Sequence, residues 1–134
     1  MPDVASPRAA FPRLIVRDAD AAIGFFEKAL GARLIERFAE PGGRVAFARL
    51  ASGYFTFSLS EEVPEWGWTS PITLGGSPVL MQLDLDDCGA VAARMEAEGA
   101  EIVISIKDRP YGKREGRLRD PFGHLWILSQ ELTT

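Results

Sequence analysis

Few residues in this chain have the type and spacing that catalysis or metal binding requires. The sequence contains one histidine, His124, and one cysteine, Cys88, and neither has an obvious His or Cys companion for a metal site. It also lacks the G-x-S-x-G motif that marks a nucleophilic serine. We therefore interpret His124 as a turn or strand-start residue, and Cys88 as a small apolar residue at the start of a helix.

Polar residues on a predicted central strand are more informative. Residues 80–85 alternate so that every second residue, beginning at Met81, is apolar and is expected to pack on a helix. Gln82 and Asp84 then face the opposite side, together with Leu80. Burying an unpaired carboxylate costs several kcal/mol. We therefore expect Gln82 and Asp84 to face a cavity rather than dry protein.

The same alternation occurs near the start of the chain. Leu14 and Val16 are expected to face a helix, which leaves Phe11, Arg13 and Ile15 on the cavity side. Two interpretations of the charged residues stay open. Arg13 and Asp84 pair with each other, or both contact a ligand.

Aromatic residues exceed what one small core requires. We expect Phe55, Phe57 and Trp126 to face the helices. Trp66 and Trp68 lie in a Gly- and Pro-rich segment, so they either fill a dimer interface or line a ligand cleft. The other aromatic residues that we consider for the cleft are Phe38, Phe47 and Tyr111.

The elements that must position these residues occur twice in the same order. After the strand-like segment 13–17, Asp18 or Asp20 can cap a helix, and Gly31 can end it. Downstream, the strand-like segment 81–85 is followed by Asp86-Asp87, a helical stripe and a closing Gly99. Each predicted helix is followed by three strand-like segments: 32–39, 44–50 and 53–60 in the first half, and 101–107, 114–119 and 125–129 in the second.

This repeat predicts an α+β fold made of tandem βαβββ modules, with concave mixed sheets and one main helix per module. We expect residues 1–134 to form a single domain, with the first module at 11–60, a linker at 61–78 and the second module at 79–130. One helix can cover only one face of a four-stranded sheet. The other face must be covered by a partner or left as a cavity.

Composition excludes several classes of partner. The net charge of −4 and the interleaving of basic with acidic residues argue against direct binding of nucleic acid. The apolar runs are much shorter than the ~20 residues of a membrane-spanning helix, so no membrane association is expected. One unpaired cysteine, with no segment of the kind that directs export, predicts a cytoplasmic protein.

Three segments resemble a known superfamily: Val16 to Ala22 (VRDADAA), Leu74 to Pro78 (LGGSP) and Gly116 to His124 (GRLRDPFGH). Together with the repeat, they are similar to the vicinal oxygen chelate superfamily. This superfamily includes glyoxalase I, extradiol dioxygenases, fosfomycin-modifying enzymes and bleomycin-resistance proteins. The resemblance extends from about residue 12 to residue 128, and the Asp-Pro-Phe-Gly-His turn is its most specific part.

The resemblance implies where a metal would bind. Enzymes of the superfamily carry cavity-facing ligands on the first and last strand of each module. The matching positions here are Phe11, Leu80, Ile127 and either Ser58 or, if the alignment shifts by one residue, Phe57. Phe11, Leu80 and Ile127 cannot bind a divalent ion, and a single hydroxyl makes a poor site. We therefore expect neither a metal nor another cofactor.

These features resemble the metal-free, bleomycin-resistance-like branch, whose members are dimers that hold a drug in a groove shared by both chains. The sequence thus predicts metal-independent binding of a bulky, planar aromatic small molecule, such as an antibiotic or natural product, by a homodimer. Phe47, Trp66, Trp68 and Tyr111 would stack on it. Residues expected to orient or contact it are Arg13, Phe38, Ser58, Gln82, Asp84 and Ile127.

Two other functions remain open. The protein could be a lyase, isomerase or dioxygenase that binds a metal through unusual ligands, such as His124 with Asp84 or Glu36. It could also be an accessory carrier of a biosynthetic pathway, which would use the same cleft as a resistance protein. The sequence does not distinguish a carrier from a resistance protein, because both only bind.

Overall fold

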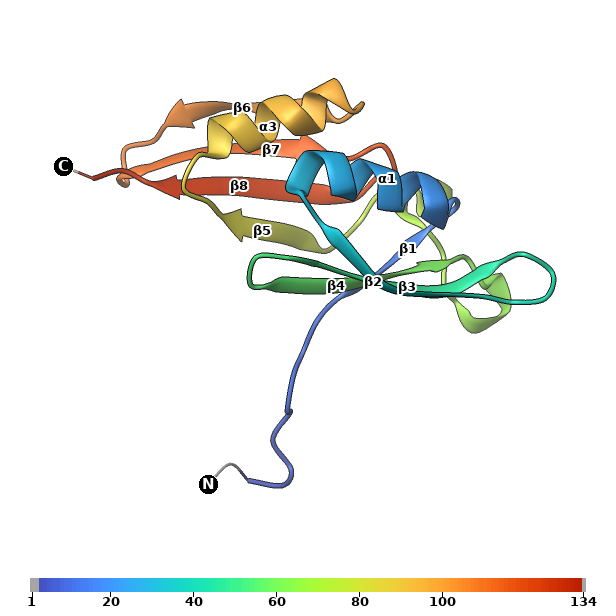
Figure 1. Cartoon of the computed structure of the whole chain (residues 1–134). Helices are drawn as coiled ribbons and strands as arrows, with labels where there is room; N and C mark the ends of the chain where they lie inside the picture. Colours follow the sequence, from blue (N-terminus) through green and yellow to red (C-terminus); the bar gives the residue numbers. More distant parts are fainter. Residues whose placement is uncertain (1–2, 134) are drawn as a thin grey trace.

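The chain forms two four-stranded sheets, each with one main helix (Figure 1). The computed structural model describes residues 3–133. The first module consists of β1 (Arg13–Val16), α1 (Ala19–Leu30), β2 (Arg33–Ala39), β3 (Val45–Ser52) and β4 (Phe55–Glu61). A 3₁₀ turn, η1 (Pro64–Trp66), and a short helix, α2 (Pro71–Leu74), lead to the second module. That module consists of β5 (Leu80–Asp84), α3 (Cys88–Ala97), β6 (Glu101–Asp108), β7 (Lys113–Arg119) and β8 (Leu125–Glu131).

Both sheets have the same topology. The strand orders are β1-β4-β3-β2 and β5-β8-β7-β6. The first strand of each module pairs in parallel with the last, and the remaining pairs are antiparallel. The predicted α+β fold of tandem βαβββ modules with mixed sheets is therefore confirmed. Strand ends differ from the prediction by one or two residues. At the start of β4, Gly53 adopts a positive φ of 57° in the turn, and the strand begins only at Phe55.

Equivalent residues begin the two main helices. Asp18 and Asp87 are the N-caps, and each accepts a hydrogen bond at 3.0 Å, from Ala21 N and Ala90 N respectively. A second cap comes from the last strand of each module. Glu61 accepts from Ala19 N at 2.9 Å, and Gln130 accepts from Cys88 N at 3.0 Å. The last strand thus fixes the helix start, which holds the helix over one face of its sheet.

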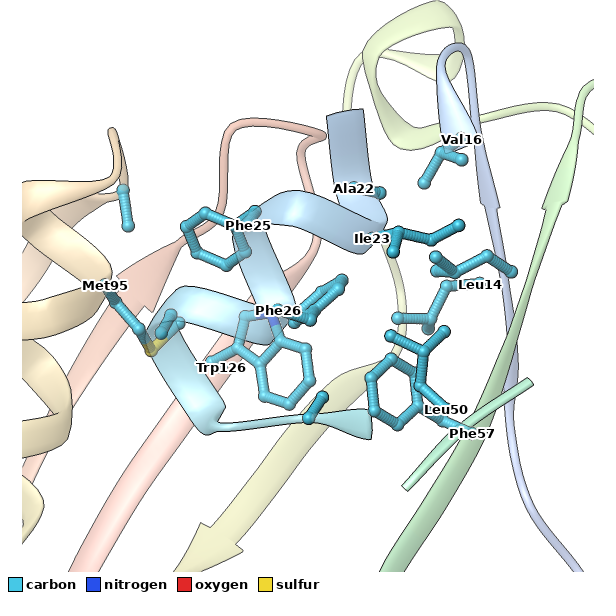
Figure 2. Close-up of a cluster of buried hydrophobic side chains, with 14 of the residues drawn as sticks. Leu14, Val16, Ala22, Ile23, Phe25, Phe26, Leu50, Phe57, Met95 and Trp126 are labelled. Carbon is cyan, nitrogen blue, oxygen red and sulfur yellow. The ribbon is translucent and has the colours of Figure 1, made fainter. Parts of the chain in front are cut away.

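One apolar core joins the two modules (Figure 2). Phe26 of α1 lies between the sheets: its ring centroid is 5.0 Å from that of Phe57 on β4 and 5.6 Å from that of Trp126 on β8. Phe55 also contacts Phe57 and Trp126, as the sequence predicts for these aromatic residues. Met95 of α3 is fully buried in the same core. The faces of the sheets that carry α1 and α3 are therefore occupied by shared packing.

The turn before β8 forms a buried polar network. The carboxylate of Asp120 accepts hydrogen bonds from Phe122 N at 2.9 Å, His124 N at 3.0 Å and Trp126 Nε1 at 2.8 Å. His124 Nε2 lies 3.0 Å from the carbonyl oxygen of Ile15 on β1, so this turn also links the modules. These contacts agree with the interpretation of His124 as a strand-start residue.

The N-terminal segment lies outside the core. Residues 3–10 are exposed and extend away from both sheets (Figure 1). Cys88 is buried at the start of α3, as expected for a small apolar residue. Among residues 3–133, no helix combines the length and the apolar composition needed to cross a membrane.

Replacing Asp120 tests the importance of this turn. Asp120→Ala removes the acceptor for three donors and leaves the buried indole N–H of Trp126 without a partner. We expect the free energy of unfolding to fall by about 2–4 kcal/mol. Urea unfolding followed by circular dichroism measures this loss. Asp86→Ala, at an exposed position, is the control, and equal losses in both variants would contradict the role of the turn.

Candidate functional site

The sheet faces that lie away from the helices carry the polar residues of interest. On β4, Phe57 and Leu59 belong to the core, so Ser58 and Ser60 face the opposite side. The strand register places Ser58 directly between Arg13 of β1 and Arg49 of β3. We call this surface of the first sheet the N-face and the corresponding surface of the second sheet the C-face.

Arginines and aromatic rings are packed together on the N-face. The guanidinium carbon of Arg13 lies 5.4 Å from the ring centroid of Phe47 and 5.9 Å from that of Trp68. The guanidinium carbon of Arg49 lies 5.1 Å from the centroid of Phe11 and 5.9 Å from that of Phe47. Both cations therefore share the Phe47 ring, in the geometry of cation–π contacts.

Three polar atoms of the N-face are buried and lack a hydrogen-bond partner within residues 3–133. They are Ser58 Oγ, Ser60 Oγ and Arg49 Nε. Most buried polar atoms in folded proteins are satisfied, and leaving one unpaired costs about 1–3 kcal/mol. Such a group needs an explanation, and a bound molecule is one that can supply the missing partner.

The linker adds its tryptophans to the edge of this surface. Val63 and Trp68 form an isolated bridge around η1, and the rings of Trp66 and Trp68 meet edge to face at 5.1 Å. Trp66 is 66% exposed, whereas Trp68 is half-buried under Arg13. Phe38, 58% exposed, is paired with Phe47 across β2 and β3. The N-face thus gathers the predicted site residues of the first module and linker, namely Arg13, Phe38, Phe47, Ser58, Trp66 and Trp68.

The C-face carries the other predicted residues. Gln82 is paired with Ile127, and its amide nitrogen donates to Asp84 Oδ1 at 3.1 Å. Both Gln82 and Asp84 are exposed, as the alternation of β5 predicts. Tyr111, in the turn between β6 and β7, donates from its hydroxyl to Glu115 Oε1 at 2.6 Å.

Glu115 is the centre of a polar network that the sequence reasoning missed. Its second oxygen accepts a hydrogen bond from Ser129 at 2.7 Å, and the residue is 8% exposed. The hydrogen bond from Tyr111, followed by that from Ser129, lowers the pKa of Glu115, and burial opposes this only in part. The same contact raises the pKa of Tyr111. Glu115 is therefore a firmly held anion rather than a general base matched to neutral pH.

The strand alternation could have identified two site residues that the sequence reasoning missed, Arg49 and Ser129. Arg49 lies two residues after Phe47, and Ser129 lies two residues after Ile127, so each shares the face of a residue that was predicted. What the alternation does not reveal is that Tyr111 reaches Glu115 from a turn. That contact depends on how the turn folds back over the sheet.

The two groups of predicted residues are not brought together within one chain. Arg13 belongs to the first sheet and Asp84 to the second, and no hydrogen bond or ion pair among residues 3–133 joins them. The expected alternative of an Arg13–Asp84 pair is therefore wrong for a single chain. The reason is geometric: the shared core lies between the helix-covered faces, so the N-face and the C-face are both on the outside.

One cleft does not coincide with either face as a whole. It has a volume of about 620 Å³ and lies between the β3–β4 turn and the β5–α3 segment. Gln82 and Asp84 line it, whereas Arg13, Phe47 and Ser58 do not. We centre the candidate site on the N-face, because the three buried polar atoms without partners lie there.

The residues present do not fit the metal site that the resemblance implies. Ser58 pairs with Arg13 as Ile127 pairs with Gln82, so the register settles the alignment on Ser58 rather than Phe57. The four positions then hold Phe11, Ser58, Leu80 and Ile127, which offer one hydroxyl.

The alternative ligands, His124, Asp84 and Glu36, do not converge either. His124 contacts Ile15, and Glu36 lies on the other sheet beside Arg49. Among residues 3–133, no three His, Cys, Asp or Glu side chains come close enough to hold an ion.

The pH dependence of stability tests the Glu115 network. The lowered pKa means that the stabilisation from Glu115 is fully present above the unfolded pKa of about 4.3 and is lost as the pH falls through the folded value. Glu115→Gln should lower the free energy of unfolding by about 1–2 kcal/mol at pH 7. The difference from the wild type should shrink near pH 3, as measured by urea unfolding. Glu27→Gln, on the exposed face of α1, controls for the lost charge, and a difference that does not change with pH would contradict the assignment.

Comparisons with known proteins agree with this fold. An uncharacterized protein of Mycobacterium bovis is 39% identical over 122 residues, which cover 89% of this chain and 80% of that protein. A Mycobacterium tuberculosis protein has the same identity and is covered over 72% of its length.

Solved structures are similar as well. TioX from a Micromonospora species is 26% identical, with a TM-score of 0.69 over 92% of this chain and 99% of TioX. A bleomycin-binding protein in complex with bleomycin is 23% identical, with a TM-score of 0.65 over 93% of this chain and 99% of that protein, which shows a shared fold. Residues 8–128 match the model of a family described as the Glyoxalase/Bleomycin resistance protein/Dioxygenase superfamily. That match covers nearly the whole chain, so the protein belongs to the glyoxalase/bleomycin resistance protein/dioxygenase superfamily.

Proposed function

We propose that this protein binds a bulky, planar aromatic small molecule, an antibiotic or other natural product, without using a metal. The observation that carries the proposal is the N-face itself, where Arg13 and Arg49 lie on aromatic rings above buried serine hydroxyls without partners. Apolar and aromatic side chains with a small number of fixed polar groups are typical of surfaces that bind small molecules. Sequestration for self-resistance and carriage in a biosynthetic pathway both use such a site.

The proposal includes a homodimer. One chain leaves both the N-face and the C-face uncovered, and an apolar sheet face open to water is unfavourable. Pairing the N-face of one protomer with the C-face of its partner would form a groove that contains all the predicted contact residues. Large hydrophobic side chains exposed at or near these faces support the pairing, among them Phe11, Phe38, Trp66, Leu80, Ile104 and Tyr111.

The relatives supply a precedent. The bleomycin-binding protein, whose fold this chain shares, binds bleomycin. A cytoplasmic location is part of our proposal, because the single buried thiol of Cys88 requires no oxidising compartment.

Tryptophan fluorescence tests the binding function. A panel of planar natural products, including anthracyclines and phenazines, should quench the exposed indoles, and at least one compound should bind with a Kd below about 0.1 mM. Trp66→Phe/Trp68→Phe retains only the buried Trp126 and should lose most of the quenching. N-acetyltryptophanamide controls for light absorption by the compounds, and calorimetry gives the affinity directly.

Metal dependence is measured on the same samples. Protein treated with EDTA should bind the same compounds with unchanged affinity. Stoichiometric zinc, nickel, manganese or iron in the purified protein, or loss of binding after EDTA, would contradict the metal-free proposal. Absence of binding across the whole panel would contradict the binding function itself.

Sedimentation velocity tests the dimer. The wild-type protein should sediment as a dimer at micromolar concentration. Leu80→Glu places a charge on the C-face, at a side chain that is 53% exposed, and should weaken the dimer at least tenfold, which corresponds to about 1.4 kcal/mol. Leu74→Glu, on the exposed surface of α2, is the matched control and should remain dimeric. If the wild-type protein is a monomer, the proposed groove between two protomers cannot form, and this part of the proposal is wrong.

A further inference from the structure

We infer that the guest of this protein is an aromatic acid, whose carboxylate is bound by Arg13 and Arg49 above Ser58. This inference rests on the proposed binding function and adds the chemical class of the ligand. It requires an excess of positive charge on the N-face, buried donors without acceptors, and guanidinium groups held in position. Each of these features is present.

The charge balance of the N-face is positive. Arg13 forms no ion pair within residues 3–133, and Arg49 has one, through Nη1 to Glu36 at 3.6 Å. Near the Phe47 ring there are therefore two guanidinium groups, and only that of Arg49 has a carboxylate partner. Like charges placed together repel each other, and an anion between them relieves that repulsion. A cationic guest would be repelled from the same place.

The unpaired donors lie where such an anion would bind. Ser58 has Arg13 on one side and Arg49 on the other in the strand register, and its hydroxyl is buried without a partner. Arg49 Nε is buried and unpaired on the same face. A carboxylate has two oxygens and accepts several hydrogen bonds, so one group can satisfy both donors and Arg13 together.

The aromatic contacts fix the orientation of the arginines. Each guanidinium carbon lies 5.1–5.9 Å from two ring centroids, and these contacts limit the motion of the group. This arrangement favours paired hydrogen bonds to a planar carboxylate, which Arg forms better than Lys does. The exposed rings of Phe38 and Trp66 nearby provide apolar surface for the aromatic part of the guest.

The carboxylates of a second copy are the competing occupants. In a groove made of an N-face and a C-face, Asp84 of the other protomer could approach Arg13 or Arg49. Glu115 is a weaker candidate, because Tyr111 and Ser129 already occupy its two oxygens. The two arrangements differ in what happens to the dimer when the arginines are changed.

Three probes of the same shape and different charge test the inference: 2-naphthoate, 2-naphthylmethanol and 2-naphthylmethylamine. Calorimetry with the full-length protein at pH 7.5 should rank the acid first, at least about tenfold tighter than the alcohol, with the amine weakest. If the alcohol or the amine binds as tightly as the acid, the inference is overturned while the binding function stands. If none of the probes and no member of the natural-product panel binds, the binding function itself fails.

Variants identify the residues responsible. Arg13→Gln/Arg49→Gln should lower the affinity for 2-naphthoate at least about tenfold and leave that for the alcohol within about threefold. Ser58→Ala should lower the affinity for the acid several-fold without lowering the free energy of unfolding, because its hydroxyl has no partner in the unliganded chain. Arg37→Gln is the matched control. It removes one positive charge from the same sheet, but Arg37 pairs with Asp20 of α1 on the helix-covered side.

Sedimentation of these variants separates ligand binding from dimer contacts. The Arg13→Gln/Arg49→Gln protein should have the same oligomeric state as the wild type. If instead it dissociates while its affinity for 2-naphthoate is unchanged, the arginines pair with a second copy, and the assignment to a ligand carboxylate is wrong.

Discussion

The structure depends on one constraint. Each sheet has a single helix to cover it, and the two helix-covered faces pack together in one core. Phe26 contacts Phe57 of one sheet and Trp126 of the other, so the modules share a core instead of forming two. His124 strengthens this junction by reaching the carbonyl oxygen of Ile15. Because the core occupies those faces, the opposite faces remain open. The residues of functional interest lie on them or, like Trp66, Trp68 and Tyr111, in the segments beside them.

The sequence predicted the repeat well because its signals are local. The caps at Asp18 and Asp87 and the turn at Gly31 depend on residues a few positions apart. Strand alternation also separated Leu14 and Val16, which are buried, from Arg13 on the other face. Such patterns can be recognised without the tertiary structure, because they follow from the residue periods of helices and strands.

The candidate site was only partly predictable, because it depends on contacts between segments far apart in the sequence. Pairing of Arg13 with Asp84 was a plausible expectation, but the shared core lies between the helix-covered faces, so the open faces that carry these residues do not face each other within one chain. The network of Tyr111, Glu115 and Ser129 depends on a turn folding over the C-face. Equally, nothing in the local pattern indicates that Arg49 and Arg13 share one aromatic ring. Contacts between distant segments decide these features.

Comparison of equivalent positions in the two modules shows how far they have diverged. Arg49 and Arg117 occupy corresponding places, since they pair with Ser58 and Ile127 respectively. The N-face adds Arg13 and an unpaired hydroxyl, where the C-face has Gln82 and Ile127.

Two residues before Arg49, the N-face has Phe47. Two residues before Arg117, the C-face has the hydrogen-bonded anion Glu115. One face is therefore aromatic and cationic, and the other carries fixed negative charge. A groove built from both would present unlike walls to its guest, so a molecule with an acidic group would be held in one orientation.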